Sequence, residues 1–192
     1  MKAKGLIIAG VAVLVVGLVF GGITIGGYNS LVKQDETTSS NYAQIENLLK
    51  ARHDKITELL GVVQAEIGQE AAIYAAITAV RDSYATSPSG DAGEITAFNN
   101  LLAVIEDNQP NFMSESGFRS LMDEISEAEN KLEIGRKDFN ESVRSYNTSI
   151  KLFPTNMVAG MFGLNKEKEY WSVSPTDTEM PSISFNFSSI NS

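Results

Sequence analysis

The side chains that most often do chemistry are scarce in this sequence. Among its 192 residues there is no cysteine and a single histidine, His53, which excludes a thiolate nucleophile and any zinc site built on cysteine. The residue three positions before His53 is Lys50, so the Glu-x-x-His pattern of two-metal helical bundles is missing. No Gly-x-Ser-x-Gly turn presents a serine nucleophile. We therefore expect no enzyme activity, no cofactor and no metal, and we interpret His53 as a surface or interhelical residue.

Charged residues that fall on or beside apolar helical faces are the other candidates for a site. They are Arg52, Glu70, Arg81, Glu106, Glu129 and Arg136. A charge buried between helices must be paired, or its ionisation shifts. Paired carboxylates could serve as acid and base or hold a cation, which keeps a hydrolase or cation site as the weaker alternative. Because arginines and glutamates are equal in number here, we favour interhelical ion pairs that fix the helix register.

The longest helix that must position these charges is predicted at residues 117–153. Small residues at Gly135, Ser142 and Ser149 would let a neighbouring helix approach closely, and Phe153 should end the helix because it precedes a proline. At 1.5 Å per residue the helix would be about 50 Å long. The steps between seam residues alternate three and four, as in a coiled coil; the seam consists of Phe118, Leu121, Ile125, Ala128, Leu132, Gly135, Phe139, Ser142, Tyr146, Ser149 and Phe153.

Three more helices are predicted outside the first apolar segment. A long helix covers residues 28–66 and could continue directly from that segment, and shorter helices follow at 69–84 and 94–107. A turn is expected near Gly68. The two short helices would form a hairpin beside part of the long pair. The predicted fold is all-α: an N-terminal transmembrane helix followed by an elongated antiparallel four-helix bundle with long coiled-coil-like helices.

Residues 5–25 carry no charge and would rise about 31 Å as a helix, which matches the hydrocarbon core of a bilayer. A cleaved signal peptide is the alternative, but no Ala-x-Ala site follows. We interpret the segment as a single-pass anchor in the cell membrane. Lys2 and Lys4 precede it, and only Lys33 follows closely, so the positive-inside rule favours a cytoplasmic N-terminus and an extracytoplasmic bundle.

The anchor contains glycines at helical spacing. Such small-x-x-x-small patterns allow close helix crossing in lipid, and they are formed by Gly10, Gly17, Gly21, Gly22 and Gly26. They predict a homo-oligomer, although glycine is also common in membrane helices that do not associate. The partners expected are therefore the lipid membrane, further copies of the chain and a membrane protein.

The formal net charge of the chain is −9. An acidic surface repels phosphate, so we expect no nucleic-acid partner. We divide the chain into an anchor at 1–27, a bundle at 28–163 and an extended or partly disordered tail at 164–192. In the tail, Ile183, Phe185 and Phe187 alternate with polar residues, as in an extended segment that docks in a groove or on a sheet edge.

One set of residues on the long helix and just after it forms a specific pattern: Glu129-Asn130 through Arg136, Phe139-Asn140, Val143, Tyr146-Asn147, Phe153-Pro154 and Ala159-Gly160. A shorter pattern lies in Tyr28-Asn29-Ser30-Leu31-Val32. Together they resemble the LemA family, over roughly residues 28–163 and with a weaker match at 183–185. The block at 45–60 lacks the proline that the family shows there, which implies a straighter helix.

The resemblance implies an N-terminal membrane helix followed by an elongated antiparallel helical bundle. No enzyme activity or cofactor is securely attached to the family, and the roles suggested for its members include organising membrane compartments and acting beside membrane proteases or in signalling. Some family descriptions place the short N-terminus outside, so both orientations stay open. We expect a non-enzymatic scaffold or assembly protein that forms homo-oligomeric arrays to organise or shape a membrane. The alternative is an adaptor or modulator of a membrane protease or receptor that binds through the bundle or tail.

Overall fold

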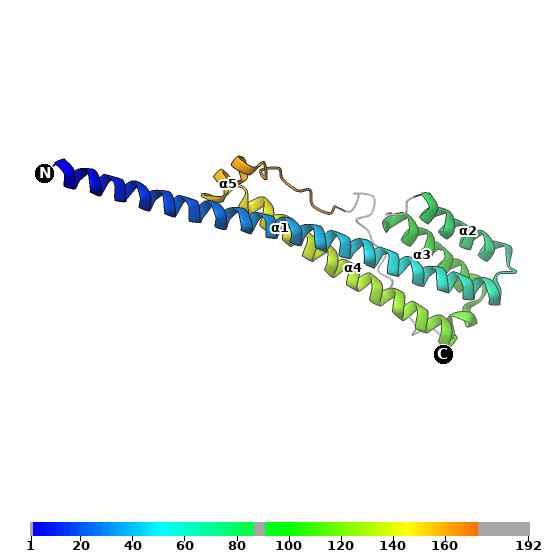
Figure 1. Cartoon of the computed structure of the whole chain (residues 1–192). Helices are drawn as coiled ribbons and strands as arrows, with labels where there is room; N and C mark the ends of the chain where they lie inside the picture. The colour runs from blue at the N-terminus through cyan, green and yellow to red at the C-terminus, as the bar shows by residue number, and fades with distance from the viewer. Residues whose placement is uncertain (1, 87–90, 173–192) are drawn as a thin grey trace. The chain divides into compact units, whose positions relative to one another are not determined.

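The computed structural model describes residues 2–86 and 91–172 (Figure 1). These residues contain no strand, so the predicted all-α class is confirmed. The elements are α1 (Lys2–Ile67), α2 (Ala71–Thr86), α3 (Asp91–Asn108), the 3₁₀ helix η1 (Pro110–Ser114), α4 (Ser116–Ser149) and α5 (Thr155–Phe162).

The described chain forms two compact units. Unit 1 contains residues 1–42 and 137–171, and unit 2 contains residues 43–136. Helices α1 and α4 each contribute one part to unit 1 and one part to unit 2.

Helix α1 is 66 residues long and joins the predicted anchor to the first bundle helix without a break. The block at 45–60 lies inside it, as the missing proline implied. The chain turns after Ile67, and only glycine fits at position 68, because a Cβ there would clash with the carbonyl oxygen of Gln64. The turn therefore lies at Gly68, where the sequence predicted it.

One helix in the described residues is long and apolar enough to cross a membrane, and it is α1. Its N-terminal part carries large apolar side chains that are more than two-fifths exposed, among them Val13 at 73% and Leu18 at 69%. Such a surface is unfavourable in water and favourable in lipid. This arrangement is consistent with single-pass anchoring in a membrane.

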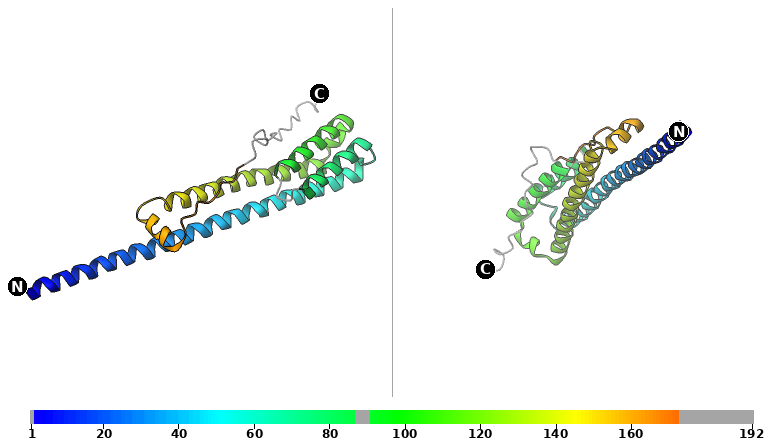
Figure 2. Two further views of the ribbon diagram at one scale, coloured as in Figure 1. Left: turned by 90° about the horizontal axis from the view of Figure 1, so that it is seen from above. Right: turned by 90° about the vertical axis from the view of Figure 1, so that its left-hand side faces the viewer.

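Unit 2 is built around one apolar core to which parts of α1 and α4 and the α2–α3 hairpin all contribute side chains. Figures 1 and 2 show α2 and α3 side by side, as the two short helices were predicted to lie. The core side chains of these helices are Ile56, Leu59, Leu60 and Val63 of α1, Ile73, Ile77 and Val80 of α2, Ile95, Phe98, Leu101, Leu102 and Ile105 of α3, and Phe118, Leu121, Met122 and Ile125 of α4.

The connection between α3 and α4 contains a helical turn that the sequence reasoning missed. The break after Asn108 was predicted, but η1 follows it and buries Phe112 and Met113 in the core of unit 2. Pro110 begins this turn, where its missing N–H leaves no hydrogen bond unmade. Phe112 also contacts Phe118 edge to face, with ring centroids 5.2 Å apart.

Helix α4 follows the predicted seam through Ser149 but ends four residues before the predicted stop. The N–H groups of Lys151 and Leu152 both donate to the carbonyl oxygen of Thr148, which closes a turn in place of another helical repeat. Phe153 is therefore 79% exposed, and its place in the seam was wrong. Pro154 is the N-cap of a further helix, α5, which the sequence reasoning did not predict.

Candidate functional site

A buried cluster of charges joins three helices of unit 2. Arg52 on α1 is 1% exposed. Its Nη1 donates to Oε2 of Glu129 on α4 at 2.8 Å, and its Nη2 donates to Oε2 of Glu94 on α3 at 3.4 Å. One guanidinium thus fixes the register of α1 against α3 and α4 in this unit.

Arg136 lies on the other side of Glu129. Its Nη1 is 4.0 Å from Oε1 of Glu129, and the residue is 8% exposed. Burial lowers the pKa of Arg136 to about 10, and the positive charge of Arg52 contributes to the shift. Glu129 is therefore the carboxylate that compensates both guanidinium groups, which makes it the central residue of the cluster.

Glu94 was missed as a member of this cluster, although the sequence contained a signal for it. It lies one helical turn before Phe98, on the same apolar face of α3, and it is 2% exposed. A carboxylate in that position needs a cationic partner. The sequence reasoning used Glu94 only to mark the start of a helix.

The other predicted ion-pair residues lie outside the cluster. Glu70, Arg81 and Glu106 are exposed, so the expectation that they form buried interhelical Arg–Glu pairs was wrong. Arg81 instead donates from Nη2 to Oε1 of Gln64 at 2.8 Å, and Glu70 accepts from Nε2 of Gln109 at 3.4 Å. Each of the three residues lies at the edge of an apolar helical face, and a long charged side chain can extend from such a position into water.

His53 was predicted to be a surface or an interhelical residue, and it lies between helices. Its ring stacks on Tyr84 of α2, with centroids 3.3 Å apart. Its Nδ1 is 2.6 Å from Oε1 of Glu94, and because a carboxylate only accepts, Nδ1 carries the proton. Its Nε2 lies 3.4 Å from Oγ1 of Thr57.

The order hydroxyl, imidazole, carboxylate is that of a serine hydrolase. Thr57 and His53, however, are both in the interior of α1, where backbone N–H groups already donate within the helix. No N–H group is left there to form an oxyanion hole, which supplies much of the rate in acyl transfer. Through Tyr84 and Glu94, His53 connects α1 to α2 and α3.

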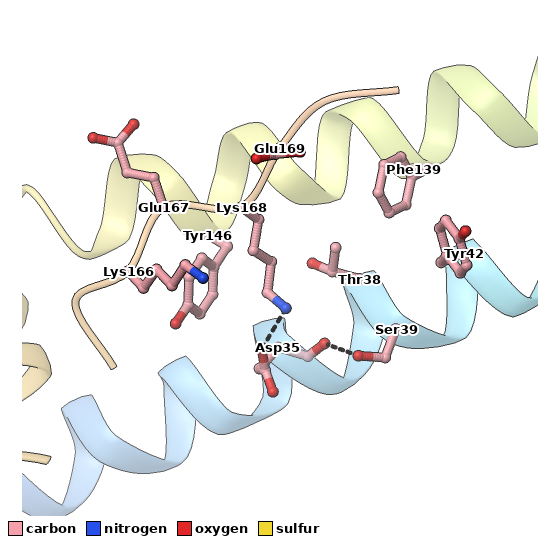
Figure 3. Close-up of a pocket in the computed structure, with 10 residues that line it drawn as sticks. All are labelled: Asp35, Thr38, Ser39, Tyr42, Phe139, Tyr146, Lys166, Glu167, Lys168 and Glu169. Carbon is pink, nitrogen blue, oxygen red and sulfur yellow. Dashed lines mark hydrogen bonds and ion pairs between the residues drawn. The ribbon is translucent and has the colours of Figure 1, made fainter. Parts of the chain in front are cut away.

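A second candidate site is a groove in unit 1. It has a volume of about 720 Å³. Figure 3 shows that helices α1 and α4 form its sides and that an extended segment crosses it. We call residues 164–171 the strap. The groove is lined by Asp35, Thr38, Ser39, Tyr42, Phe139, Tyr146, Lys166, Glu167, Lys168 and Glu169.

Two asparagines of α4 hold the strap by its backbone. Asn147 donates to the carbonyl oxygen of Lys168 and accepts its N–H, both at 2.8 Å. Asn140 makes the same pair of bonds with Trp171, at 3.1 and 2.8 Å. Seven helical residues span about 10.5 Å and three extended residues span about 10 Å, so the two pairs match in spacing.

Side chains add further contacts between the strap and unit 1. Lys168 Nζ is 2.5 Å from Oδ1 of Asp35 and lies over the ring of Tyr146. The Tyr146 hydroxyl donates to the carbonyl oxygen of Leu164 at 2.8 Å, and burial raises the pKa of this hydroxyl. The ring of Trp171 lies 6.0 Å from that of Tyr42. The start of the predicted tail is therefore a docked element, whereas Ile183, Phe185 and Phe187 lie outside the described residues.

The anchor glycines face outward from α1. An added Cβ would meet nothing within 4 Å in the described chain at any of the predicted packing positions, which are Gly10, Gly17, Gly21, Gly22 and Gly26. Backbone at these positions is therefore accessible to a neighbouring helix in lipid.

An apolar helix of membrane length that continues into an all-helical domain defines a membrane-associated helical protein. The model of the LemA family matches residues 41–185, and the chain belongs to the LemA family. This confirms the resemblance drawn from the residues of the long helix.

Two known proteins are similar to part of the chain. They are Magnetosome protein MamQ 2 and Magnetosome protein MamQ 1 of Paramagnetospirillum magneticum, and each is 31% identical to this chain over 85 residues. The matched segment is 44% of this chain and 30% of either relative. The chain thus matches less than a third of the length of these relatives.

Proposed function

We propose that this protein is a membrane-anchored, non-enzymatic scaffold whose copies associate on one face of a membrane. The observation that carries the proposal is the continuity of α1, which passes from the apolar segment into the rest of unit 1 as one helix. A helical connection transmits the orientation of the anchor to the residues that follow it, whereas a flexible linker would not. Association of anchors would therefore also align the first parts of the bundles.

The anchors would associate through glycines. Gly17 and Gly21 lie four residues apart and Gly10 lies two turns earlier, so the three share one face of α1. Without side chains there, two backbones can approach until dispersion contacts replace contacts with lipid.

Size determination of the full chain in mild detergent tests this proposal. A scaffold should form oligomers when it is purified alone, because its partner is another copy. Gly17→Leu with Gly21→Leu should reduce the oligomer to a smaller species while the bundle stays folded. A wild-type chain that is monomeric both in detergent and in cells would overturn the scaffold.

The orientation we propose has a cytoplasmic N-terminus, since Lys2 and Lys4 precede the anchor. The chain has no cysteine, so a Ser89→Cys variant offers a single thiol. An impermeant thiol reagent should label it from outside intact cells. Labelling only after the membrane is opened would reverse the orientation.

The second candidate function is an adaptor for a membrane protein, and the groove of unit 1 favours it. Asn140 and Asn147 bind backbone groups, which every extended segment possesses, so the same amides could hold a segment of a partner in place of the strap. A photo-reactive residue in place of Ser39, which lines the groove, tests this in native membranes. An adaptor should be crosslinked to a different membrane protein, whereas a scaffold should be crosslinked only to itself.

A further inference from the structure

Helix α5 and the turn before it present an apolar surface to the outside. Within unit 1, the exposed fractions are 57% for Leu152, 79% for Phe153, 48% for Met157, 63% for Met161 and 50% for Phe162. A cluster of large apolar side chains left exposed in this way marks an interaction surface.

An adjoining face of α5, to which the half-exposed Phe162 also belongs, fixes its position on α1. Val158 is buried, and its Cγ2 lies 3.1 Å from the place a Cβ would take at Gly27. The ring of Phe162 contacts that of Tyr28, with centroids 4.8 Å apart. Figures 1 and 2 show α5, in orange, alongside α1 at this level.

Gly27 and Tyr28 follow directly on the uncharged stretch at 5–25. When that stretch occupies the hydrocarbon core, Tyr28 lies at the membrane–water boundary, where tyrosine is enriched. Helix α5 contacts α1 at the same level. The exposed apolar surface of α5 therefore lies beside the apolar surface of the anchor, at the membrane–water boundary.

The composition of this part of the chain fits lipid. Residues 150–164 contain no acidic residue and a single cation, Lys151, in a chain whose net charge is −9. A helix of eight residues is about 12 Å long, which is too short to cross a bilayer. An amphipathic helix of this kind lies in the plane of the interface, with its apolar face at the headgroup–acyl boundary.

We propose that α5 and the turn at 150–154 form a second membrane contact, which inserts Phe153, Met157 and Met161 into the leaflet from which the bundle emerges. The occupant of the surface is lipid, because the surface is continuous with the membrane-spanning part of α1. The inference rests on that span and not on self-association. Its consequence is that unit 1 is held to the membrane at two places, which restricts rotation of α1 about its own axis.

Depth-dependent quenching in vesicles tests the proposal on the full chain. Because the chain has no cysteine, Met161→Cys can be labelled with an environment-sensitive fluorophore. Glu141→Cys, an exposed position on α4 in the same unit, is the matched control, and Val15→Cys reports insertion of the anchor. The vesicles contain phosphatidylcholine and phosphatidylglycerol, with a nitroxide either near the headgroup or deep in the acyl chain.

The label at 161 should be quenched by the shallow nitroxide several-fold more than the label at 141, and it should resist iodide in the water. Equal access of iodide to both positions would overturn the proposal. Protection from iodide and from both nitroxides would also overturn it, since protein and not lipid would then cover α5. If the label at position 15 is not quenched by the deep nitroxide, α1 does not span the membrane and the proposal fails with it. A chain that is monomeric should show the same quenching at position 161. Failure of the proposed self-association is therefore distinguishable from failure of the second membrane contact.

A charge on the outer face provides an independent arm of the test. With the label at Phe153→Cys, the additional change Met161→Asp should reduce shallow quenching several-fold, because a carboxylate resists entry into the boundary. Asn156→Asp adds the same charge at the edge of that face and should reduce the quenching much less. Far-UV circular dichroism identifies a variant that has lost helix. Equal quenching in the two folded variants would contradict insertion of this face.

Discussion

The side-chain amide of Asn140 binds both backbone groups of Trp171: Oδ1 accepts the N–H at 2.8 Å, and Nδ2 donates to the carbonyl oxygen at 3.1 Å. Asn147 repeats the arrangement on Lys168, two turns further along α4. Both asparagines belong to the positions that carry the resemblance to the LemA family. The structure therefore gives these positions a physical task, which is to hold an extended segment against unit 1.

Release of the strap can be followed by fluorescence, because Trp171 is the only tryptophan of the chain. Asn140→Ala removes both bonds and should weaken docking by about 1–3 kcal/mol. We expect a red shift of the Trp171 emission and faster exchange of its amide hydrogen. Asn140→Asp keeps the acceptor and loses the donor, so its effect should be intermediate. Asn130→Ala, at an exposed position of α4, is the control; unchanged emission in Asn140→Ala would contradict the strap.

Glu129 should be the most sensitive residue of the charge cluster. Glu129→Gln removes the negative charge that lies beside both Arg52 and Arg136, and loss of one partner of a buried pair typically costs about 3–5 kcal/mol. Glu127→Gln is the matched control: Glu127 is exposed and pairs with Lys131 one turn away. Chemical denaturation of both variants should separate them clearly. Equal stability of the two would show that Glu129 is solvated.

Arg136→Ala should lower the melting temperature, although less than Glu129→Gln does. Glu129 keeps its bond to Arg52 at 2.8 Å in this variant, and the loss comes from the volume of the buried side chain. Arg136→Met restores that volume without the charge and should recover most of the stability, because an apolar replacement of a buried ion is often neutral. If Met is as damaging as Ala, the charge of Arg136 matters more than its packing.

Gly135 allows close approach of α1 and α4 within unit 2. A Cβ at this position would lie 3.0 Å from Cδ1 of Leu48, whereas one at Gly61, also inside a helix, would meet nothing within 4 Å. Gly61→Ala should stabilise the protein by about 0.5–1 kcal/mol through helix propensity. Gly135→Ala should gain less or nothing, and Gly135→Leu should be strongly destabilising. Thermal melts in detergent rank the variants; a tolerated leucine at 135 would show that the helices are not in close contact there.

The helices and their seam could be predicted because apolar spacing records which face is buried. Phe118, Ile125 and Leu132 are all buried as that spacing required. The end of α4 could not be predicted in this way. Pro154 disfavours helix only at the residue before it, whereas the observed stop depends on a turn closed at Thr148 and on the start of α5.

The charge cluster was only partly predictable, because spacing places a charge near an apolar face without telling which way a long side chain extends. Arg52 and Arg136 are turned inward, whereas Arg81 reaches water from a similar position. Glu94 could have been found from its place one turn before Phe98. The strap could not, since its bonds go to backbone groups that every sequence has.

Self-association of the anchor is the central claim, and energy transfer between labelled copies in vesicles tests it most directly. Donor and acceptor labels at Glu141→Cys should show transfer that persists as lipid dilutes the protein. Transfer should fall to the level of random collisions in Gly17→Leu with Gly21→Leu, and it should fall less in Gly22→Leu with Gly26→Leu, which alters a different face of α1. Transfer at the random level in the wild-type chain at every dilution would contradict the scaffold and leave the adaptor in its place.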